Sequence, residues 1–270
     1  MIIFKSINKL NKEVNFKAKI GFVPTMGALH KGHISLIKRS KKICKKTVVS
    51  IFVNPSQFNK KKDFRNYPKK NKQDIDVLKK LKVDYLLMPN VKEVYINKKS
   101  SKIKLNKEDK IMCAYYRPGH FEGVLAVINQ FLIKFKPKYI FFGEKDYQQL
   151  FLIKKFINSK FKTKVYSCPT VRDVNKVALS SRNLLLRSND IKKSSIIANL
   201  LLKLKNKLKK NINYKSEIVK VYLKINSIKN INIEYLEIRS KFNLSKNFNK
   251  NNLKIFIAYY NKGVRLIDNY

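Results

Sequence analysis

Short apolar runs alternate with helical patterns through the first two thirds of the chain. The runs end near Pro or Gly, which is typical of buried strands, and the stretches between them repeat apolar residues at helical spacing. Repeated strand–helix–strand units predict a parallel sheet with helices on both faces. The predicted strands are 19–25, 47–55, 83–89, 138–143 and 164–169, and the predicted helices are 33–46, 69–82, 124–136 and 146–160.

Two regions break this alternation. The stretch from about 90 to 118 fits neither pattern, and we expect an insertion or a short hairpin there. After about residue 175 the order changes to two helices followed by three strands, and "NKG" at 261–263 predicts a hairpin between the last two strands. The chain is therefore expected to be α/β, with a Rossmann-like parallel-sheet catalytic domain at 1–172 and a smaller α+β C-terminal domain at 173–270.

Charge is the most unusual feature of the composition. The chain has 61 Lys and Arg residues against 17 Asp and Glu, a net charge of +44. One interpretation is a nucleic-acid or anionic-membrane partner. The other is compositional drift of the kind that an A+T-rich genome imposes, because Lys, Asn and Ile are over-used while Gly and Ala are scarce. The lysines are scattered over every predicted element, so drift is favoured and no nucleic-acid partner is expected.

Other bulk features point to a cytoplasmic protein. We find neither an uncharged apolar run of transmembrane length nor a signal peptide, so no membrane association is expected. The cysteines Cys44, Cys113 and Cys168 are odd in number and form no metal-type pair, which fits a reducing compartment.

Against this drift, the placement of rare residues is informative. The chain has three histidines and seven glycines. All three histidines and five of the glycines lie in three segments: "PTMGALHKGH" (24–33), "YYRPGHFEGV" (115–124) and "FFGEKDYQQL" (141–150). The first and third of these, together with "FVNPSQF" (52–58), follow predicted strands. The carboxyl ends of parallel strands are where such sheets bind ligands.

The first segment has the features of a phosphate-binding turn. Gly27 permits a tight turn, and a helix that begins near His30 directs N–H groups outward. His30 and His33 share one helical face and can donate hydrogen bonds to charge that develops in a reaction. The alternative is a structural turn in which the histidines only cap the helix. The strand–turn–helix context favours the nucleotide interpretation.

The other segments supply neutral amides and cations. Asn54 and Gln57 suit a hydroxyl or carboxylate of a small substrate. Lys145 can meet a phosphate, Asp146 can hold a ribose hydroxyl or another polar group, and Gln149 lies one helical turn beyond Lys145.

The segment "ALSSRN" (178–183) adds two hydroxyls and a guanidinium, which suit phosphate oxygens. Together these residues predict a site for a triphosphate beside a small acid.

Six motifs, in this order, carry a resemblance to a known family. "PTMGALHKGH", "SIFVNPSQF", "YYRPGHFEGV", "FFGEKDYQQL", "PTVRD" and "ALSSRN" resemble the pantothenate synthetase (pantoate–β-alanine ligase) family, and the closing "RLIDN" matches its usual ending. The H-x-G-H element alone would indicate only the wider nucleotidylyltransferase superfamily. The resemblance covers nearly the whole chain, with a looser match over 185–255.

The resemblance implies a two-step reaction. The carboxylate of (R)-pantoate attacks the α-phosphorus of ATP, giving pantoyl adenylate and pyrophosphate. The amine of β-alanine then attacks the acyl carbon, giving pantothenate and AMP. Mg²⁺ is expected to accompany the triphosphate, with unknown protein ligands. The resemblance also implies a homodimer and, from the loop position of "ALSSRN", a lid role for the C-terminal domain.

The family's functional residues transfer to matching positions of this chain. Gln57 and Gln149 are expected to hold pantoate, with Gln57 also near β-alanine and Asn54 beside it. His33, His30 and Lys145 are the expected catalytic residues, with His33 in the acid role. The expected ATP contacts are Met26, Gly27, Ala28, Leu29, His30, Lys31, Gly32, His33, Gly143, Glu144, Lys145, Asp146, Val171, Leu179, Ser180, Ser181 and Arg182.

The chain departs from the family pattern at two places, and two other functions remain as alternatives. Asn175 and Lys176 stand where an Asp-Gly pair is common, and Cys113 stands where an acidic residue is common. One alternative is a related nucleotidylyltransferase for another small acid, against which the amides of "VNPSQF" and "GEKDYQQ" argue. The other is an inactive, basic nucleic-acid-binding relic, which would need a contiguous lysine stripe.

Overall fold

The structure is a computed structural model that describes residues 1–59, 61–95, 103–208 and 214–270. Over these residues the chain divides into two compact units. The first unit comprises 1–144 and 148–169, and the second comprises 145–147 and 170–270. The assignment of a catalytic role to one unit and a lid role to the other stays a prediction.

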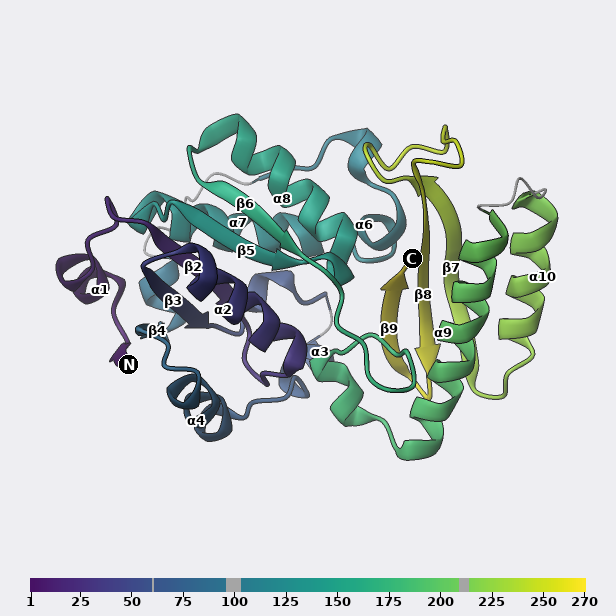
Figure 1. Cartoon of the computed structure of the whole chain (residues 1–270), viewed down its shortest axis with the longest axis horizontal. Coiled ribbons are helices and arrows are strands. Elements are labelled where there is room, and N and C mark those ends of the chain that lie inside the picture. The colour runs from purple at the N-terminus through teal and green to yellow at the C-terminus, as the bar shows by residue number, and fades with distance from the viewer. Residues whose placement is uncertain (60, 96–102, 209–213) are drawn as a thin grey trace. The chain divides into compact units, whose positions relative to one another are not determined.

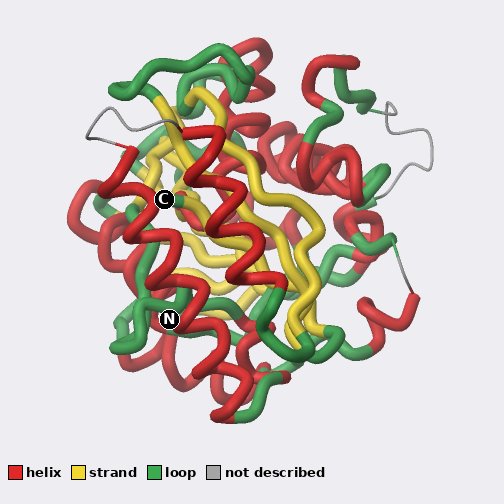
Figure 2. The backbone as a smooth tube through the Cα atoms, turned by 90° about the vertical axis from the view of Figure 1, so that its right-hand side faces the viewer, coloured by secondary structure: helices red, strands yellow, loops and turns green. Residues whose placement is uncertain are grey.

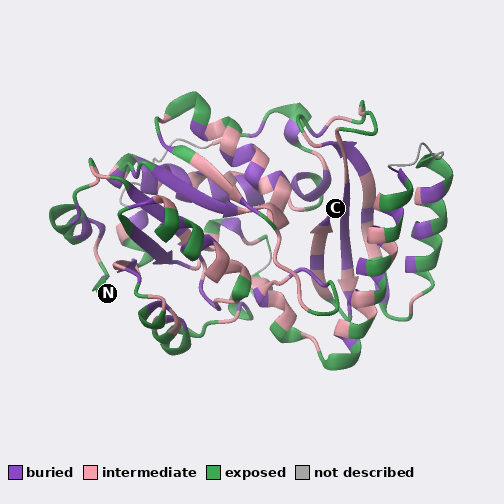
Figure 3. Ribbon diagram, viewed as in Figure 1, coloured by how far each residue is buried: buried purple, intermediate pink, exposed green. Residues whose placement is uncertain are grey.

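The first unit is built on the parallel sheet that the sequence predicts. Its described strands lie side by side in the order β1-β4-β3-β2-β5-β6, and every pair is parallel (Figure 1). β2, β3 and β5 are largely buried (Figure 3), so they read as continuous apolar runs. The strands are β1 (Ile2–Phe4), β2 (Ile20–Thr25), β3 (Lys46–Ile51), β4 (Tyr85–Leu87), β5 (Tyr139–Gly143) and β6 (Lys164–Cys168).

Helices cover both faces of this sheet because successive strand residues point to opposite sides. Val23 of β2 belongs to a buried cluster with side chains of α2 and α4. Its neighbour Phe22 packs edge-on against Phe131 and Phe135 of α7, with ring centroids 5.4 and 4.9 Å away. The longer helices of this unit are α1 (Ile7–Glu13), α2 (Lys31–Ile43), α4 (Asn71–Lys80), α7 (His120–Phe135) and α8 (Tyr147–Lys160), of which α8 begins in the second unit. Figure 2 shows the described helices in red and the described strands in yellow.

The structure replaces the hairpin expected within residues 90–118 by short helices in the described part, and it leaves the alternative of an insertion untested. Residues 96–102 lie outside the described residues. The described part contains no hairpin but the short helices α5 (Val91–Val94), η2 (Lys107–Asp109) and α6 (Met112–Tyr116). Such short helices span too few turns to leave a periodic pattern. β1 and α1 were not predicted either, because β1 is an edge strand with two exposed residues and α1 buries only Ile7 and Leu10.

The strand order reverses between β2 and β5. From β2 the chain builds outward through β3 and β4, and it then returns to place β5 on the other side of β2. Ligands of open parallel sheets bind outside the carboxyl ends of the strands at such a reversal. "PTMGALHKGH" runs through the end of β2 into α2, and "FFGEKDYQQL" runs through the end of β5 into η3 (Glu144–Asp146) and α8. The topology therefore explains why the unusual segments occur where they do.

The second unit has the α+β composition that the sequence predicts. Leu201 of α9, Ile225 of α10 and Ile255 of β8 belong to one buried cluster. Lys262 and Gly263 have φ of 51° and 81°, which form the tight hairpin expected from "NKG". Its elements are η4 (Ser181–Leu185), α9 (Ser188–Leu208), α10 (Tyr214–Asn226), β7 (Ile231–Ser240), β8 (Leu253–Asn261) and β9 (Val264–Asn269).

A partly buried ion pair joins two motifs that lie far apart in the sequence. Arg172 of "PTVRD" donates to both carboxylate oxygens of Asp268 of "RLIDN", over 2.7 and 2.8 Å, and its guanidinium lies 4.1 Å from the ring centroid of Tyr270. Burial lowers the pKa of Arg172, but the Asp268 carboxylate raises it above its ordinary value overall. The pair fixes the start of the loop that leads to "ALSSRN".

That loop keeps its turn despite the unusual Asn175-Lys176 pair. The amide of Val177 donates to the Asp173 carboxylate over 2.9 Å, and Lys176 adopts a left-handed φ of 67°. Gly adopts this conformation without strain, whereas a residue with a Cβ loses about 1 kcal/mol or more. The departure from Asp-Gly therefore costs stability but does not remove the turn.

Two further expectations concern bulk properties. None of the described helices combines the length and apolar character needed to cross a membrane. Cys44, Cys113 and Cys168 are all buried and unbridged. Burial raises the pKa of the Cys44 and Cys168 thiols.

Candidate active site

The turn after β2 is left-handed at two successive residues. Gly27 and Ala28 have φ of 79° and 49°. Thr25 Oγ1 accepts a hydrogen bond from the Gly27 amide over 3.2 Å and donates to the Ser50 carbonyl of β3 over 2.7 Å. The tight turn expected at Gly27 is present, and it brings the chain from the end of β2 to the start of α2.

A buried carboxylate that sequence reasoning missed receives the amides of this turn. Asp74 of α4 is only 2% exposed. Its Oδ2 accepts from Ala28 N over 2.8 Å, and its Oδ1 accepts from Leu29 N over 2.7 Å. Asp74 lies four residues before the fully buried Leu78, so a carboxylate on the apolar face of a helix was the available signal.

The two histidines both cap α2. His30 Nδ1 accepts from the Gly32 amide over 3.1 Å, and His33 Nδ1 accepts from the His30 amide over 3.3 Å. A ring nitrogen that accepts cannot carry the proton, so each neutral imidazole is protonated on Nε2. The capping interpretation is therefore correct for Nδ1. Capping also fixes the tautomer in which Nε2–H is a donor. The two imidazole ring centroids lie 4.1 Å apart.

Next to this turn, the neutral amides after β3 form a buried network. Gln57 Nε2 lies 2.6 Å from Met26 Sδ, which brings the second segment to the first. Asn54 is 1% exposed, and its Nδ2 donates to Gln57 Oε1 over 3.3 Å and to the Gly123 carbonyl over 3.0 Å. Both hydrogens of the Asn54 amide are thus used by the protein: one orients the Gln57 side chain, and the other ties Asn54 to α7.

Tyr95 completes this network. Its hydroxyl donates to Asn54 Oδ1 over 2.9 Å and lies 3.1 Å from Ser56 Oγ. Burial raises the pKa of the Tyr95 hydroxyl, although the hydrogen bonds to Ser56 and Asn54 oppose the shift. The hydroxyl therefore stays protonated at neutral pH and holds the Asn54 side chain in place.

The third histidine supports the backbone of the same segment. Arg117 can only donate, so His120 Nε2 accepts from it over 2.8 Å and His120 Nδ1–H donates to the Gln57 carbonyl over 2.7 Å. His120 is buried at the start of α7. The segment "YYRPGHFEGV", for which the sequence suggested no role, thus fixes the main chain that carries Gln57.

Gly123 allows α7 to approach this main chain closely. A Cβ at Gly123 would lie 2.2 Å from the Ser56 carbonyl oxygen and 2.8 Å from the Gln57 amide nitrogen. Those are backbone atoms, which cannot rotate away. The short helix η1 (Pro55–Gln57) can therefore lie where it does only because residue 123 has no side chain.

In the second unit, the closing "RLIDN" motif holds the chain at Lys145. The Asn269 side chain donates to the Lys145 carbonyl over 2.8 Å. Lys145 Nζ lies 3.2 Å from Asp146 Oδ1, and the Lys145 side chain is 17% exposed. Lys145 and Asp146 thus lie together.

The other predicted residues of the second unit lie on neighbouring backbone. Leu179 N donates to the Val171 carbonyl over 3.0 Å, and Ser180 Oγ caps η4 by accepting from Arg182 N over 3.2 Å. Ser181 is buried, whereas Arg182 is half-buried. The residues of "ALSSRN" are therefore held close to Val171.

The remaining predicted residues of the first unit lie at or next to the carboxyl ends of β2 and β5. Gly143 is the last residue of β5, and Glu144 follows it. Lys31 is exposed at the start of α2. Gln149 is half-buried in the first turn of α8.

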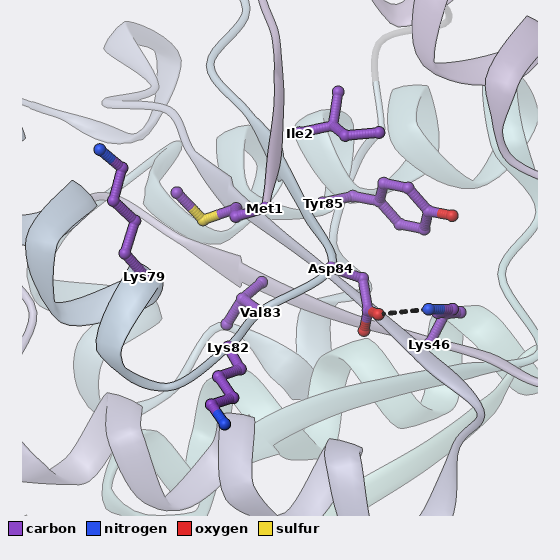
Figure 4. Close-up of a pocket in the computed structure, with 8 residues that line it drawn as sticks. All are labelled: Met1, Ile2, Lys46, Lys79, Lys82, Val83, Asp84 and Tyr85. Carbon is purple, nitrogen blue, oxygen red and sulfur yellow. Dashed lines mark ion pairs between the residues drawn. The ribbon is translucent and has the colours of Figure 1, made fainter.

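A cavity of about 390 Å³ lies at the opposite edge of the sheet (Figure 4). Its lining includes the first residues of three strands, at the amino ends of these strands: Ile2 of β1, Lys46 of β3 and Tyr85 of β4. Lys46 and Asp84 form an ion pair of 2.8 Å there. None of the predicted site residues lines this cavity.

The described residues contain no group of three or more His, Cys, Asp or Glu side chains placed to hold a metal ion. The protein therefore gives Mg²⁺ no carboxylate cluster of its own in that part of the chain.

Comparison with known proteins identifies the family. The family model for pantoate–β-alanine ligase matches residues 2–270. The chain belongs to this family. The match takes in both units and every motif on which the resemblance rested.

Individual relatives agree with this assignment. The pantothenate synthetase of Francisella philomiragia is 47% identical over 196 residues, which are 71% of this chain and 75% of the relative. The crystal structure of pantothenate synthetase from Thermus thermophilus has a TM-score of 0.93 at 29% identity and covers 100% of this chain and 99% of its own. The pantoate–β-alanine ligase of Francisella tularensis, complexed with β-γ ATP and β-alanine, has a TM-score of 0.86 at 38% identity, over 100% of this chain and 97% of its own.

The glycines of this family member differ in why they are needed. A Cβ at Gly21, Gly27, Gly32 or Gly123 would lie within 3.0 Å of another atom. Gly119 and Gly263 have open space but positive φ. Gly143 has neither constraint, because a Cβ there would meet nothing within 4 Å and its φ is ordinary. The protein's own packing does not explain this glycine at the end of β5.

These contacts predict that the same Gly→Ala substitution will change the free energy of unfolding differently at positions 123 and 143. Gly123→Ala should lower the free energy of unfolding by at least about 1–3 kcal/mol, since the new methyl group collides with the backbone of η1. Gly143→Ala, the matched control, should leave it unchanged or slightly higher. Urea unfolding of both variants measures the difference, and equal midpoints would contradict the close approach described at Gly123.

Proposed function

We propose that this chain synthesises pantothenate from (R)-pantoate, β-alanine and ATP through a pantoyl-adenylate intermediate, with release of pyrophosphate and AMP. Family membership over residues 2–270 supports this reaction. The observation that carries the proposal in this chain is the pair of histidines that cap α2, in a segment whose Met26 contacts Gln57. Two imidazoles with fixed Nε2–H donors suit phosphate charge, and an oriented amide suits a small hydroxy acid.

In the first step, the pantoate carboxylate is itself the nucleophile, so no activated Ser or Cys is needed. The pantoate carboxylate oxygen bonds to the α-phosphorus as the bond to pyrophosphate breaks. Gln57 and Gln149 hold pantoate, and Asn54 acts by orienting Gln57 through the hydrogen bond that it donates to Gln57 Oε1. Catalysis of this step depends mainly on alignment and on stabilisation of charge.

The histidines and Lys145 act on the phosphate charge. His30 and His33 donate from Nε2 to oxygens that gain charge in the transition state, and His33 takes the acid role. Lys145 offsets charge as an ammonium, while Ser180, Ser181 and Arg182 are phosphate contacts. Preset donors of this kind need no reorganisation during the reaction, and the caps at Nδ1 preset the histidines.

In the second step, the β-alanine amine attacks the acyl carbon and AMP leaves with the acyl–phosphate oxygen. Gln57 lies near β-alanine in this scheme. The amine attacks as the free base and loses a proton as the amide forms.

Three further properties belong to the same proposal. Mg²⁺ accompanies ATP as part of the substrate, where it would neutralise triphosphate charge. The protein is cytoplasmic and forms a homodimer. The net charge of +44 reflects composition, and nucleic acid is not a partner.

Neither alternative function is favoured. The family match spans both units, and the amides of Gln57 and Gln149 are the polar groups expected for pantoate. The test is to measure pantothenate and AMP formed by purified protein, with each of the three substrates omitted in turn. Product that requires all three supports the proposal. Pyrophosphate release without pantothenate would indicate another acceptor, and no turnover would reject the function.

Two substitutions test the phosphate roles. His33→Ala and Lys145→Ala should each reduce turnover on the order of 100- to 1,000-fold, since each removes a donor to developing charge. His33→Ala also removes a cap, which costs about 1 kcal/mol of stability and is too little to unfold the protein. Steady-state kinetics with circular dichroism checks both, and Lys38→Ala on the exposed side of α2 is the control. Near-normal turnover in either variant would remove that residue from the mechanism.

A substitution at Gly143 tests whether bound ATP occupies the open space at the end of β5. Gly143→Ala should raise the KM for ATP by at least about tenfold, because a single added carbon in a shaped site typically has that effect. The KM for β-alanine should stay constant. An unchanged KM for ATP would separate Gly143 from the nucleotide.

A further inference from the structure

The turn from Met26 to His30 has the geometry of an anion-binding nest. Successive amides of a turn can point toward one site, and such concavities commonly hold phosphate. Here Gly27 and Ala28 are the left-handed residues, and the amides of Ala28 and Leu29 converge. Both amides donate to the carboxylate of Asp74, so the protein supplies the anion of this nest itself.

Asp74 is well placed to define the turn. It comes from α4, on a separate element 46 residues further along the chain, and it is 2% exposed. A carboxylate has an oxygen for each of the two amides, whereas an asparagine of the same size has one oxygen and one NH₂ group. Gly27 adds a further constraint, because a Cβ there would lie 3.0 Å from Asp74 Oδ2. The nest and the carboxylate are therefore closely fitted.

The turn leads directly into the histidine caps. Leu29, whose amide Asp74 holds at 2.7 Å, is followed by His30, the N-cap of α2. The His30 amide in turn donates to His33 Nδ1. A displacement of the turn would therefore change the position of His30 and the hydrogen bond that orients His33.

We propose that Asp74 is a positioning residue for adenylate formation: it occupies the nest after β2 in place of a substrate phosphate and thereby sets the positions of His30 and His33. This inference rests on the proposed function for its kinetic consequence only. It assigns the triphosphate to the histidine Nε2–H donors and to Lys145, and it excludes the amides of Ala28 and Leu29 as phosphate contacts.

The kinetic test is Asp74→Asn, with Asp76→Asn as a matched control. Asp76 lies on the same helix, and its side chain is exposed. Asp74→Asn should lower kcat for pantoate-dependent pyrophosphate release by on the order of 100-fold, the loss typical of a shift of about 1 Å in catalytic groups. The KM for β-alanine should change far less than kcat, because Gln57 contacts this turn only through the Met26 side chain. Asp76→Asn should behave as the unmodified chain does.

A second control distinguishes this positioning role from the stability that any carboxylate gives by accepting a main-chain hydrogen bond. Asp84 also accepts a main-chain hydrogen bond, from Thr47 N over 2.9 Å, at the other edge of the sheet. Asp84→Asn should lose stability without a selective loss in kcat. Equal kcat losses in the Asp74→Asn and Asp84→Asn variants, scaled to folded protein, would overturn the proposal.

Hydrogen exchange of the unmodified protein gives a readout that does not depend on a variant folding. The amides of Ala28 and Leu29 should be protected without ATP, and Mg-ATP should add little, since their acceptor is internal. Protection that appears only with Mg-ATP would show that a phosphate is the acceptor and would overturn the proposal. Absence of pantothenate formation by the unmodified protein would reject the proposed function instead and would leave this exchange result valid.

Discussion

The requirement that buried backbone amides find acceptors determines the geometry of the candidate site. Where a strand of a parallel sheet ends, the chain must turn back into a helix, and the amides of that turn lose the partners they had in the sheet. In this chain Asp74 and the Nδ1 atoms of His30 and His33 supply the acceptors. In the two histidines, the ring nitrogen that caps the helix determines which nitrogen carries the proton, so the cap also decides which atom can donate in the proposed mechanism.

A comparable division operates after β3. Asn54 uses both hydrogens of its amide on the protein, and one of them is donated to the side chain of Gln57, the residue proposed to meet the substrate. Residues at and just before the start of α7 support this arrangement. Arg117 donates to His120, and His120 donates to the Gln57 carbonyl. Gly123 lets α7 approach closely because it has no side chain. The binding residue is a single amide, but its position depends on a second helix that contacts no substrate in the proposed scheme.

The sequence predicted most of the sheet and the placement of the candidate site at strand ends. Apolar runs identified β2, β3, β4 and β5, since strands buried on both faces leave a strong local signal. The edge strand β6 was also predicted, although only Cys168 of it is fully buried. Local signals also explain the failures. β1 has three residues and two are exposed, so it leaves no pattern. Asp74 reaches Ala28 across 46 positions and Arg172 reaches Asp268 across 96, and such pairings depend on topology that no window of sequence contains.

The glycine at the end of β5 shows that two glycines near the candidate site are constrained in different ways. A Cβ at Gly123 would strike backbone, so the close approach of α7 and η1 allows no side chain there. A Cβ at Gly143 would meet nothing within 4 Å, so the chain's own packing would accept a side chain at the end of β5. Folding alone therefore constrains position 123 and leaves position 143 open to substitution.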